Sequence, residues 1–421
     1  MLSVSSTEEQ KSTQIRQSEI NIGTIGHVDH GKTTLVQALT GVWAAKHSEE
    51  LRRGITIKLG YADAAIYRCP KCNSPECHST KPTCAACKDE CEFVRAISFV
   101  DAPGHEALMA TMISGAAVMD GAILVIAADE HCPQPQTREH LAAIQITGVN
   151  KIIVVQNKID IVDEPRIRSS YDEITSFLKG TVAKDAPIIP ISAQHSINID
   201  ALIQAMEEHI PTPKRDPDKT PLMYVVRSFD INKPGTQFQD LAGGVVGGSL
   251  MRGKFSVGEE IEIRPGIRTE KHGQPHYEPL LSKIVSLQAG KINVEEVQCG
   301  GLIGIGTLLD PSLTKANGLT GNLVGLPGKL PPTVSEATVE THILDRAVGT
   351  KEMTEISKVR VKENLLLDVG TAITAGTVTS VKGEEATIKL TRPVCVEKGM
   401  RSALSRKMAG RWRLIGYGVI K

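Results

Sequence analysis

The chain has 421 residues, 41% hydrophobic and 23% charged, which are ordinary globular values and enough chain for two or three domains. The 48 Lys and Arg balance the 48 Asp and Glu, so bulk charge excludes general attraction to nucleic acid or membranes. No apolar run reaches the 18 residues that suggest a membrane helix, and residues 1–18 lack a signal-peptide core. We therefore expect a cytoplasmic protein without membrane contact, beginning with a flexible tail at 1–18.

Residues 19–210 alternate short Ile- and Val-rich runs with helix-length amphipathic segments, the pattern of an α/β domain with a mostly parallel sheet. Strands are predicted at 21–26, 96–102, 121–129, 151–158 and 187–193. Helices are predicted from Lys32, from His105, from Thr137, around 167–178 and over 198–209.

Residues 211–221 hold four prolines and five charges, which indicates a linker. After it the apolar runs become short, β-branched and separated by Gly and Pro, as in antiparallel barrels. A second proline-rich break at 328–334 divides this part, so we predict two β-barrel domains, at 222–328 and 329–421.

The segment from Gly26 to Thr33 matches the P-loop pattern G-x-x-x-x-G-K-[ST] between a strand and a helix. Glycines at 26 and 31 let Asp29, His30 and their neighbours turn backbone N–H groups toward phosphate. Lys32 would reach the β- and γ-phosphates, and the hydroxyl of Thr33 would bind Mg²⁺. A glycine turn with an incidental lysine is the alternative.

Asp101-Ala102-Pro103-Gly104 follows a predicted strand, which would place the Asp101 carboxylate beside Mg²⁺ and the Gly104 N–H near the γ-phosphate. By itself D-x-x-G is a common turn. His105 is the imidazole in this segment that could position the attacking water, although a histidine at a helix start is more often a cap or a surface residue.

Asn157-Lys158-Ile159-Asp160 closes the fourth predicted strand. An aspartate accepts two hydrogen bonds, and guanine offers two adjacent donors where adenine offers one, so GTP or GDP is expected. Ser192, Ala193 and Gln194 end the next strand, where a backbone N–H could meet guanine O6; an ordinary strand-end turn is the competing interpretation.

Arg53-Gly54-Ile55-Thr56-Ile57 supplies a threonine that could bind Mg²⁺ and the γ-phosphate, giving a loop ordered by GTP and released after hydrolysis.

Six of the nine cysteines fall between 69 and 91, within an insert at 66–92. Cys69 and Cys72 form one C-x₂-C pair, and Cys84 and Cys87 form another eleven residues later, a spacing that suits tetrahedral Zn²⁺. Four thiolates would leave no position for water, so the site would be structural. Cys77, His78 and Cys91 are spare candidates, and free thiols or a different quartet are the alternatives.

Residues 391–421 carry eight Lys or Arg and one acid, a local charge of 8 − 1 = +7 that suits tRNA phosphates. A solvated face is the default for any one of these residues. Aromatic residues make up only 3%, which favours backbone or acceptor-end contacts over stacking on many bases.

The strings NIGTIGHVDHGKTTL, RGITI, DAPGH, GAAVMDGAILVIAA, PQTREH and NKID resemble the translational GTPases, the elongation factor Tu family. The cysteine-rich insert, CPQPQT at 132–137, GGVVGGSLMRGKFSVGEEIEIRPG and GRWRLIGYG resemble the gamma subunits of translation initiation factor 2, in their compact archaeal form.

This resemblance implies a GTPase domain and two β-barrels that together bind methionylated initiator tRNA in the GTP state and release it after hydrolysis. It implies alpha and beta subunit partners and delivery to the small ribosomal subunit and mRNA. The matching residues are Lys32 and Thr34 for phosphates, Thr33 and Thr56 for Mg²⁺, Asp29 and Gly54 for a second Mg²⁺, Asn157, Lys158 and Asp160 for the base, and His105 near water.

Two other functions stay open at this point. One is an elongation-type or selenocysteine-specific aminoacyl-tRNA carrier, which the cysteine insert disfavours. The other is an elongation factor Tu-like metabolic GTPase such as a sulfate-activating subunit, which should bind no tRNA.

Overall fold

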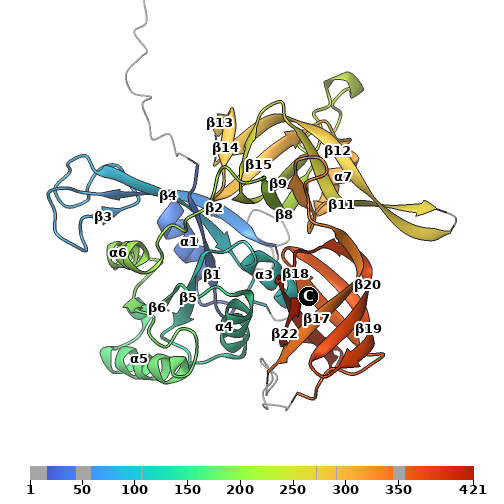
Figure 1. Cartoon of the computed structure of the whole chain (residues 1–421). Helices are drawn as coiled ribbons and strands as arrows, with labels where there is room; N and C mark the ends of the chain where they lie inside the picture. Colours follow the sequence, from blue (N-terminus) through green and yellow to red (C-terminus); the bar gives the residue numbers. More distant parts are fainter. Residues whose placement is uncertain (1–16, 44–57, 106–107, 272, 291, 345–355) are drawn as a thin grey trace, which may run out of the picture.

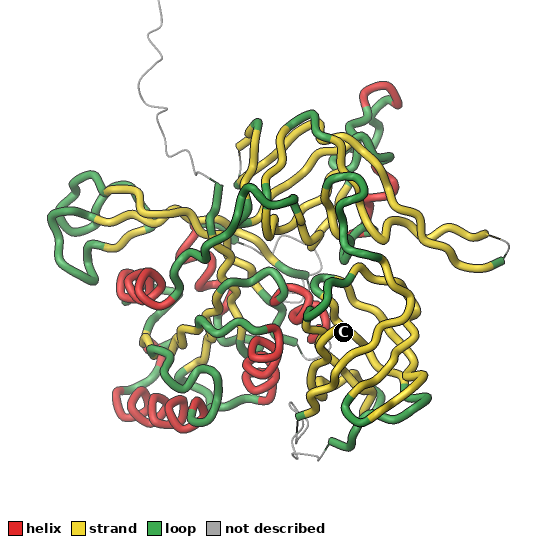
Figure 2. Tube along the Cα trace, in the orientation of Figure 1, coloured by secondary structure: helices red, strands yellow, loops and turns green. Residues whose placement is uncertain are grey.

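The computed structural model describes residues 17–43, 58–105, 108–271, 273–290, 292–344 and 356–421. It shows an α/β domain followed by two β-barrels (Figures 1 and 2). This is the fold class that the sequence predicts. Among the described residues no helix is both long and apolar enough to cross a membrane.

The first domain is built on a seven-stranded sheet in the order β3-β2-β4-β1-β5-β6-β7. Its strands are β1 (Ile20–Ile25), β2 (Gly60–Arg68), β3 (His78–Ser79), β4 (Glu92–Asp101), β5 (Gly121–Ala127), β6 (Ile152–Asn157) and β7 (Ile188–Pro190). Strands β4, β1, β5, β6 and β7 are parallel, whereas β2 is antiparallel to β4.

Helices cover both faces of this sheet. They are α1 (Lys32–Thr40), α3 (Met109–Ala116), α4 (Pro135–Thr147), α5 (Glu164–Leu178) and α6 (Ile199–His209), with a 3₁₀ turn, η2, at Ile159–Ile161. Alternate residues of the central strands point to opposite sides. One set packs on α1 and α6, and the other packs on α3, α4 and α5. Because β4, β1, β5, β6 and β7 run parallel, their carboxyl ends lie at the same edge of the sheet, and the loops that follow them converge there.

Strand β2 is absent from the sequence-based prediction. Its sequence, GYADAAIYR, is rich in alanine and holds a single β-branched residue, so it lacks the Ile and Val signal of its neighbours. It is specified by pairing along the whole of β4, with Gly60 opposite Asp101 and Arg68 opposite Glu92. The cysteine-rich insert occupies the far tip of this β2–β4 hairpin, at the left of Figure 1.

The second module is a barrel whose strand order is β11-β16-β8-β9-β15-β12, and it closes because β11 also pairs with β12. Its elements are β8 (Leu222–Phe229), η3 (Phe238–Asp240), β9 (Val245–Arg252), β10 (Lys254–Ser256), β11 (Glu260–Lys271), β12 (Gln274–Ala289), β13 (Ile292–Val294), β14 (Glu296–Gln298), β15 (Leu302–Thr307), α7 (Pro311–Thr314), η4 (Lys315–Asn317) and β16 (Leu323–Gly325). The β11–β12 hairpin extends beyond the barrel body (Figure 1).

The third module is a closed six-stranded barrel in the order β17-β20-β19-β18-β21-β22. Its strands are β17 (Thr333–Ile343), β18 (Asn364–Val369), β19 (Ala372–Lys382), β20 (Glu385–Cys395), β21 (Arg401–Met408) and β22 (Arg411–Ile420). Each barrel encloses its own apolar core.

Polar contacts join the α/β domain to the second module. The amide of Asn21 donates to Ser249 Oγ at 2.8 Å, and Arg215, in the helix- and strand-free segment 211–221, pairs with Asp120 at 2.7 Å. Residues 1–16 of the expected tail lie outside the described residues. Gln17, assigned to that tail, instead binds the second module, since its side chain accepts from Gln298 N at 3.0 Å and donates to Gly300 O at 3.1 Å.

The third module contacts both others. The Arg252 and Glu397 side chains pair at 2.7 Å between the barrels. Against the α/β domain, Ser114 Oγ donates to Thr371 O at 2.9 Å, and Arg413 pairs with Glu139 of α4 at 2.7 Å.

Candidate nucleotide site and metal centre

The loop between β1 and α1 needs glycine at both ends for steric reasons. Gly26 has φ 135°, and a Cβ there would lie 2.3 Å from Val125 O. Gly31 has φ 89° at the start of α1, and a Cβ there would lie 2.3 Å from Asn157 Nδ2. The loop is thus wedged between β5 and the end of β6, with the amino end of α1 available to an anion.

Lys32 lies under the turn that follows β4. It is 6% exposed, its ammonium donates to His27 O, and burial lowers the pKa of Lys32 to about 8. A Cβ on Gly104 would stand 2.6 Å from Lys32 Nζ and 3.0 Å from Val28 N. Gly104 therefore approaches the loop as closely as a glycine can. A phosphate beside Nζ would favour the charged ammonium that burial disfavours.

The structure places the two expected magnesium ligands together. Thr33 Oγ1 donates to Asp101 Oδ2 at 2.7 Å, while Thr24 Oγ1 holds Asp101 Oδ1 at 2.8 Å. Asp101 is fully buried at the end of β4. A hydroxyl and a carboxylate at this spacing are oxygen ligands of the kind that Mg²⁺ prefers. Asp29 is exposed on the loop at φ 61°, whereas Gly54 and Thr56 lie outside the described residues.

His30 contributes its backbone, rather than its side chain, to the candidate phosphate-binding loop. Its ring is 1% exposed, Nδ1 donates to Val125 O at 3.1 Å, and burial lowers the pKa of His30 to about 4. Its carbonyl accepts from Asn157 Nδ2 at 2.9 Å. The side chain that holds the loop from below is His140, whose Nδ1 accepts from Gly26 N at 2.9 Å.

His140 was not among the predicted site residues. It is fully buried on α4, and burial, followed by the charge of Lys32, holds its pKa well below the usual histidine range. A neutral ring keeps Nδ1 available as an acceptor. The only sequence signal is its place in PQTREH, because the contact joins residues 114 positions apart.

The residues expected to bind the base converge at the ends of β6 and β7. Asn157 Oδ1 accepts from Ala193 N at 3.0 Å, and Lys158, at φ 64°, extends its ammonium to Asp129 at 3.2 Å. Asp160 is exposed, and a hydrogen bond from Ser192 is the main cause that lowers its pKa. Asp160 is thus ionised near neutral pH and only accepts hydrogen bonds, which suits the two donors of guanine.

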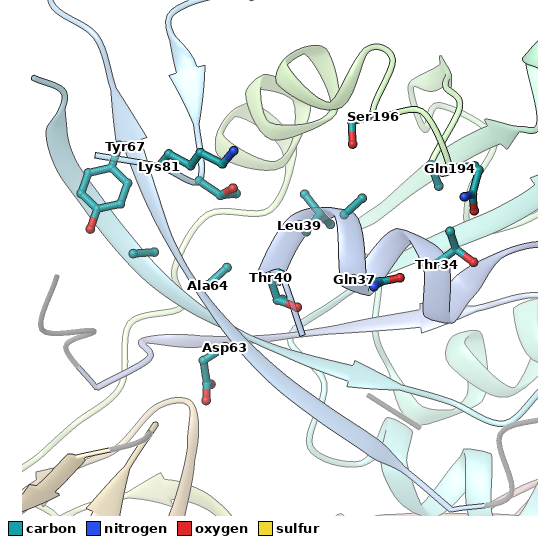
Figure 3. A pocket seen from close by; sticks show the side chains of 15 residues that line it. Thr34, Gln37, Leu39, Thr40, Asp63, Ala64, Tyr67, Lys81, Gln194 and Ser196 are labelled. Carbon is teal, nitrogen blue, oxygen red and sulfur yellow. The ribbon is translucent and has the colours of Figure 1, made fainter. Parts of the chain in front are cut away.

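A pocket of about 680 Å³ lies along α1 and extends to the loop that follows β7. Figure 3 shows Thr34 and Gln37 of α1 on one side of the pocket and Gln194 and Ser196 of the loop after β7 on another. Lys81 of the cysteine-rich insert lies across from them. Thr34 and Gln194, both predicted to bind nucleotide, therefore line one continuous space.

His105 is exposed directly after Gly104, and its carbonyl accepts from Leu108 N at 2.9 Å. Residues 106 and 107 lie outside the described residues, so the predicted helix start is described only from Met109.

The insert brings Cys69, Cys72, Cys84 and Cys87 together, with all four sulfurs within 4.8 Å of one another. The Cys69–Cys87 and Cys72–Cys84 sulfur distances are 3.5 and 3.7 Å. A tetrahedron with metal–sulfur bonds of about 2.3 Å has edges of about 3.8 Å, so the cluster matches Zn²⁺ geometry. Backbone N–H groups, chiefly that of Cys87, lower the pKa of Cys84 to about 6, which favours a thiolate ligand. Cys77 and Cys91 pack beside this cluster in the same small core.

Several basic side chains of segment 391–421 already contact other groups of the protein. Arg413 is 11% exposed and paired with Glu139, Arg406 pairs with Glu363, and Lys421 pairs with Glu340. Arg401 lies 5.1 Å over the Tyr417 ring. Arg392 also donates to Thr320 O at 3.2 Å, so more than half of the eight basic residues have partners within the protein, which weakens the expectation of a uniform phosphate-binding surface.

A P-loop GTPase domain followed by two barrels defines the elongation factor Tu-like translational GTPases. The model of the elongation factor Tu GTP-binding domain matches residues 17–212, and that of elongation factor Tu domain 2 matches residues 243–320. The model of the initiation factor eIF2 gamma C-terminal domain matches residues 335–420. The chain belongs to the family of translation initiation factor 2 gamma subunits and is a GTPase of translation initiation.

Curated relatives cover nearly the whole chain. Translation initiation factor 2 subunit gamma of Methanocaldococcus jannaschii is 59% identical over 98% of this chain and 99% of its own length. That of Pyrococcus horikoshii is 60% identical over 96% of this chain and 98% of its own length.

Solved structures support the fold alone, because their identity is low. A bacterial selenocysteine-specific elongation factor has a TM-score of 0.73 at 22% identity, covering 96% of this chain, which spans 58% of that protein. Elongation factor SelB of Methanococcus maripaludis, solved with the GTP analogue GPPNHP, has a TM-score of 0.70 at 23% identity, covering 97% of this chain and 80% of that one.

Proposed function

We propose that this chain binds methionylated initiator tRNA in its GTP state, delivers it to the small ribosomal subunit and mRNA, and releases it after GTP hydrolysis. It would act in the cytoplasm as the gamma subunit of a heterotrimer with alpha and beta subunits. The relatives at 59–60% identity support initiation over the elongation-type and sulfate-activating alternatives.

The observation that carries the tRNA proposal is a pocket of about 270 Å³ between the α/β domain and the second module. Tyr61 and Asp63 of β2 form one wall, and Phe229, Gly247 and Leu302 lie on the barrel side. At about 30 Å³ per water it has room for about nine waters, and therefore for a methionyl side chain.

This pocket is adjacent to the predicted magnesium site, because its wall begins one residue further along β2. Gly60 of β2 pairs with Asp101, and Tyr61 follows it in the pocket wall. A ligand held there would contact the strand that leads out of segment 53–57, in which Thr56 is the proposed γ-phosphate sensor. Such a place could couple cargo affinity to the nucleotide, which requires contacts that differ between GTP and GDP.

At the nucleotide we assign Gly26, Asp29, His30, Gly31, Lys32, Thr33 and Thr34 to phosphate and Mg²⁺, and Asn157, Lys158, Asp160, Ser192, Ala193 and Gln194 to the base. Asp101 and Gly104 would place Mg²⁺ and the γ-phosphate, and His105 would orient the attacking water. Thr56 would complete the Mg²⁺ shell, with Asp29 and Gly54 at a second magnesium.

The four-cysteine cluster is proposed to hold a structural Zn²⁺. Four thiolates fill a tetrahedral site, and the insert has only a small core of its own to hold its fold. The domain boundaries that we propose are 19–210, 222–328 and 329–421, joined by the linker 211–221.

The test is filter binding of methionylated initiator tRNA to the trimer with GTP or GDP. Thr56→Ala should reduce the GTP preference and leave GDP-state binding nearly unchanged, whereas Thr175→Ala, on the outer helix α5, should change neither. A tenfold preference corresponds to about 1.4 kcal/mol of coupling. Equal wild-type affinity in both nucleotide states would contradict the carrier proposal, and equal affinity for methionylated elongator tRNA would favour an elongation-type carrier.

A further inference from the structure

A third, separate cavity of about 210 Å³ lies where all three modules meet. Helices α3 and α4 contribute Ile113 and Thr147, β8 contributes Tyr224, and the third module contributes Asp368 and Met400. None of these residues belongs to the nucleotide site or to the proposed tRNA pocket. At about 30 Å³ per water the cavity has room for about seven waters.

Asp368 is the unusual member of this cavity. On β18 its neighbours Leu367 and Val369 pack into the barrel core, while Asp368 lines the cavity beside the α/β domain. The residue is 3% exposed, and neither carboxylate oxygen has a hydrogen-bond partner among the described residues. A buried polar group without a partner costs about 1–3 kcal/mol, and more when it is charged.

In the part of the chain that the structure describes, no group that faces Asp368 supplies the missing partner. The lining residues of α3 and α4 carry no titratable side chain, and burial raises the pKa of Tyr224 of β8 to about 12, so that phenol is neutral. Arg401 of β21 also lines the cavity, but its guanidinium lies over Tyr417 and donates to Ile146 O at 3.5 Å. Burial raises the pKa of Asp368 well above its usual range, which favours the protonated carboxyl.

We propose that this cavity binds a small alkylammonium ion, whose ammonium pairs with Asp368 and whose carbon chain lies against Ile113 and Met400. The chemistry of the lining favours this class. An anion would have as its counter-charge only the Arg401 guanidinium, which already contacts Tyr417 and Ile146 O. A metal ion would need more oxygen ligands than Asp368 and the Thr147 and Tyr224 hydroxyls offer. Ala117, Ile146 and Ala403 complete an apolar wall that suits a short hydrocarbon chain.

Entry of the ligand requires only a local adjustment. Met400 lines the cavity with an unbranched, flexible side chain that can move to admit a ligand. The bound ion would contact α3, α4, β8 and β18 at once and would stabilise the arrangement of the three modules.

The test is isothermal titration calorimetry of the whole chain with n-butylamine at pH 7, in two buffers of different ionisation enthalpy. Binding converts a carboxyl and an ammonium ion into a carboxylate–ammonium pair and one released proton. We therefore expect about one proton released per amine bound. Association with surface carboxylates, which are already ionised, releases none.

Asp368→Asn keeps the shape and cannot ionise, so it should weaken butylamine binding at least tenfold and abolish proton release. Asp240→Asn, on the exposed turn η3, is the matched control and should change neither. If Asp368→Asn does not fold, Ala117→Leu fills the cavity from the α3 side and should also prevent binding. No amine binding, binding without proton release, or equal binding of n-butanol would each overturn the proposal.

Discussion

Replacement of Arg413 by methionine should destabilise the contact between the third module and the α/β domain. The Arg413 and Glu139 side chains are 11% and 2% exposed, and their charged atoms lie 2.7 Å apart. Removal of one member of a buried pair typically costs about 3–5 kcal/mol, because the other charge stays buried without compensation. We expect a cost in this range at pH 8 for Arg413→Met.

The pH dependence follows from Glu139. Burial raises the pKa of Glu139, and Arg413 opposes that rise, so loss of Arg413 should raise this pKa further. An acid whose folded-state pKa exceeds its unfolded value destabilises the folded protein above the folded pKa and ceases to do so below the unfolded one. The cost of Arg413→Met should therefore shrink as the pH falls from 8 toward 5.

The assay is urea denaturation followed by the fluorescence of Trp412, which precedes Arg413 on β22. Trp43 is the other tryptophan in the chain, so Trp43→Phe leaves one reporter. The double variant Glu139→Gln/Arg413→Met should recover most of the loss, because it leaves no buried charge. Arg168→Met is the matched control: its partner Glu164 is exposed on α5, and the pair should contribute less than about 1 kcal/mol. A cost of Arg413→Met below about 1 kcal/mol at every pH would refute this reasoning.

Three further predictions concern the nucleotide and metal sites. Asp160→Asn should weaken guanine nucleotides by more than about 2 kcal/mol and favour XTP in competition binding, and an unchanged preference for GTP would exclude Asp160 from base recognition. His105→Ala should leave GTP affinity nearly unchanged and slow stimulated hydrolysis by about 10²-fold or more in single-turnover assays; the reverse pattern would make His105 a binding residue. Zinc occupancy, measured by metal analysis of reduced protein, should fall with acidification because the thiolates take up protons. Chelation of the metal should increase hydrogen exchange at 69–91 and leave GTP affinity unchanged. Loss of GTP binding together with zinc would contradict a purely structural role.

The sequence alone predicts where the residues of contiguous motifs lie, whereas their roles stay predictions. Lys32, Asp101 and Asp160 belong to short motifs at strand ends. The spacing within each motif follows from the turn that the chain makes there. The structure places their side chains at one edge of the sheet. The fold class was equally accessible, because Ile- and Val-rich runs mark the parallel strands and Gly- and Pro-separated runs mark the barrels.

Contacts between distant segments could not be predicted. His140 receives the Gly26 N–H across 114 positions, and neither residue announces the other. Local charge places Arg413 in the predicted phosphate-binding segment, because it does not reveal the Glu139 carboxylate on another module. Strand β2 cannot be predicted from its own alanine-rich sequence, because it acquires strand structure by pairing with β4.

The contacts between modules have a consequence for synthesis on the ribosome. The α/β domain emerges first, yet Glu139 and Asn21 are buried in the finished protein against Arg413 and Ser249, which emerge more than 200 residues later. Until then Glu139 and Asn21 lack these partners, and the apolar surface of α3 and α4 that the last strands will cover is not yet covered. The nascent GTPase domain is thus exposed to wrong association for the time needed to translate both barrels, about 10–40 s at about 5–20 residues per second.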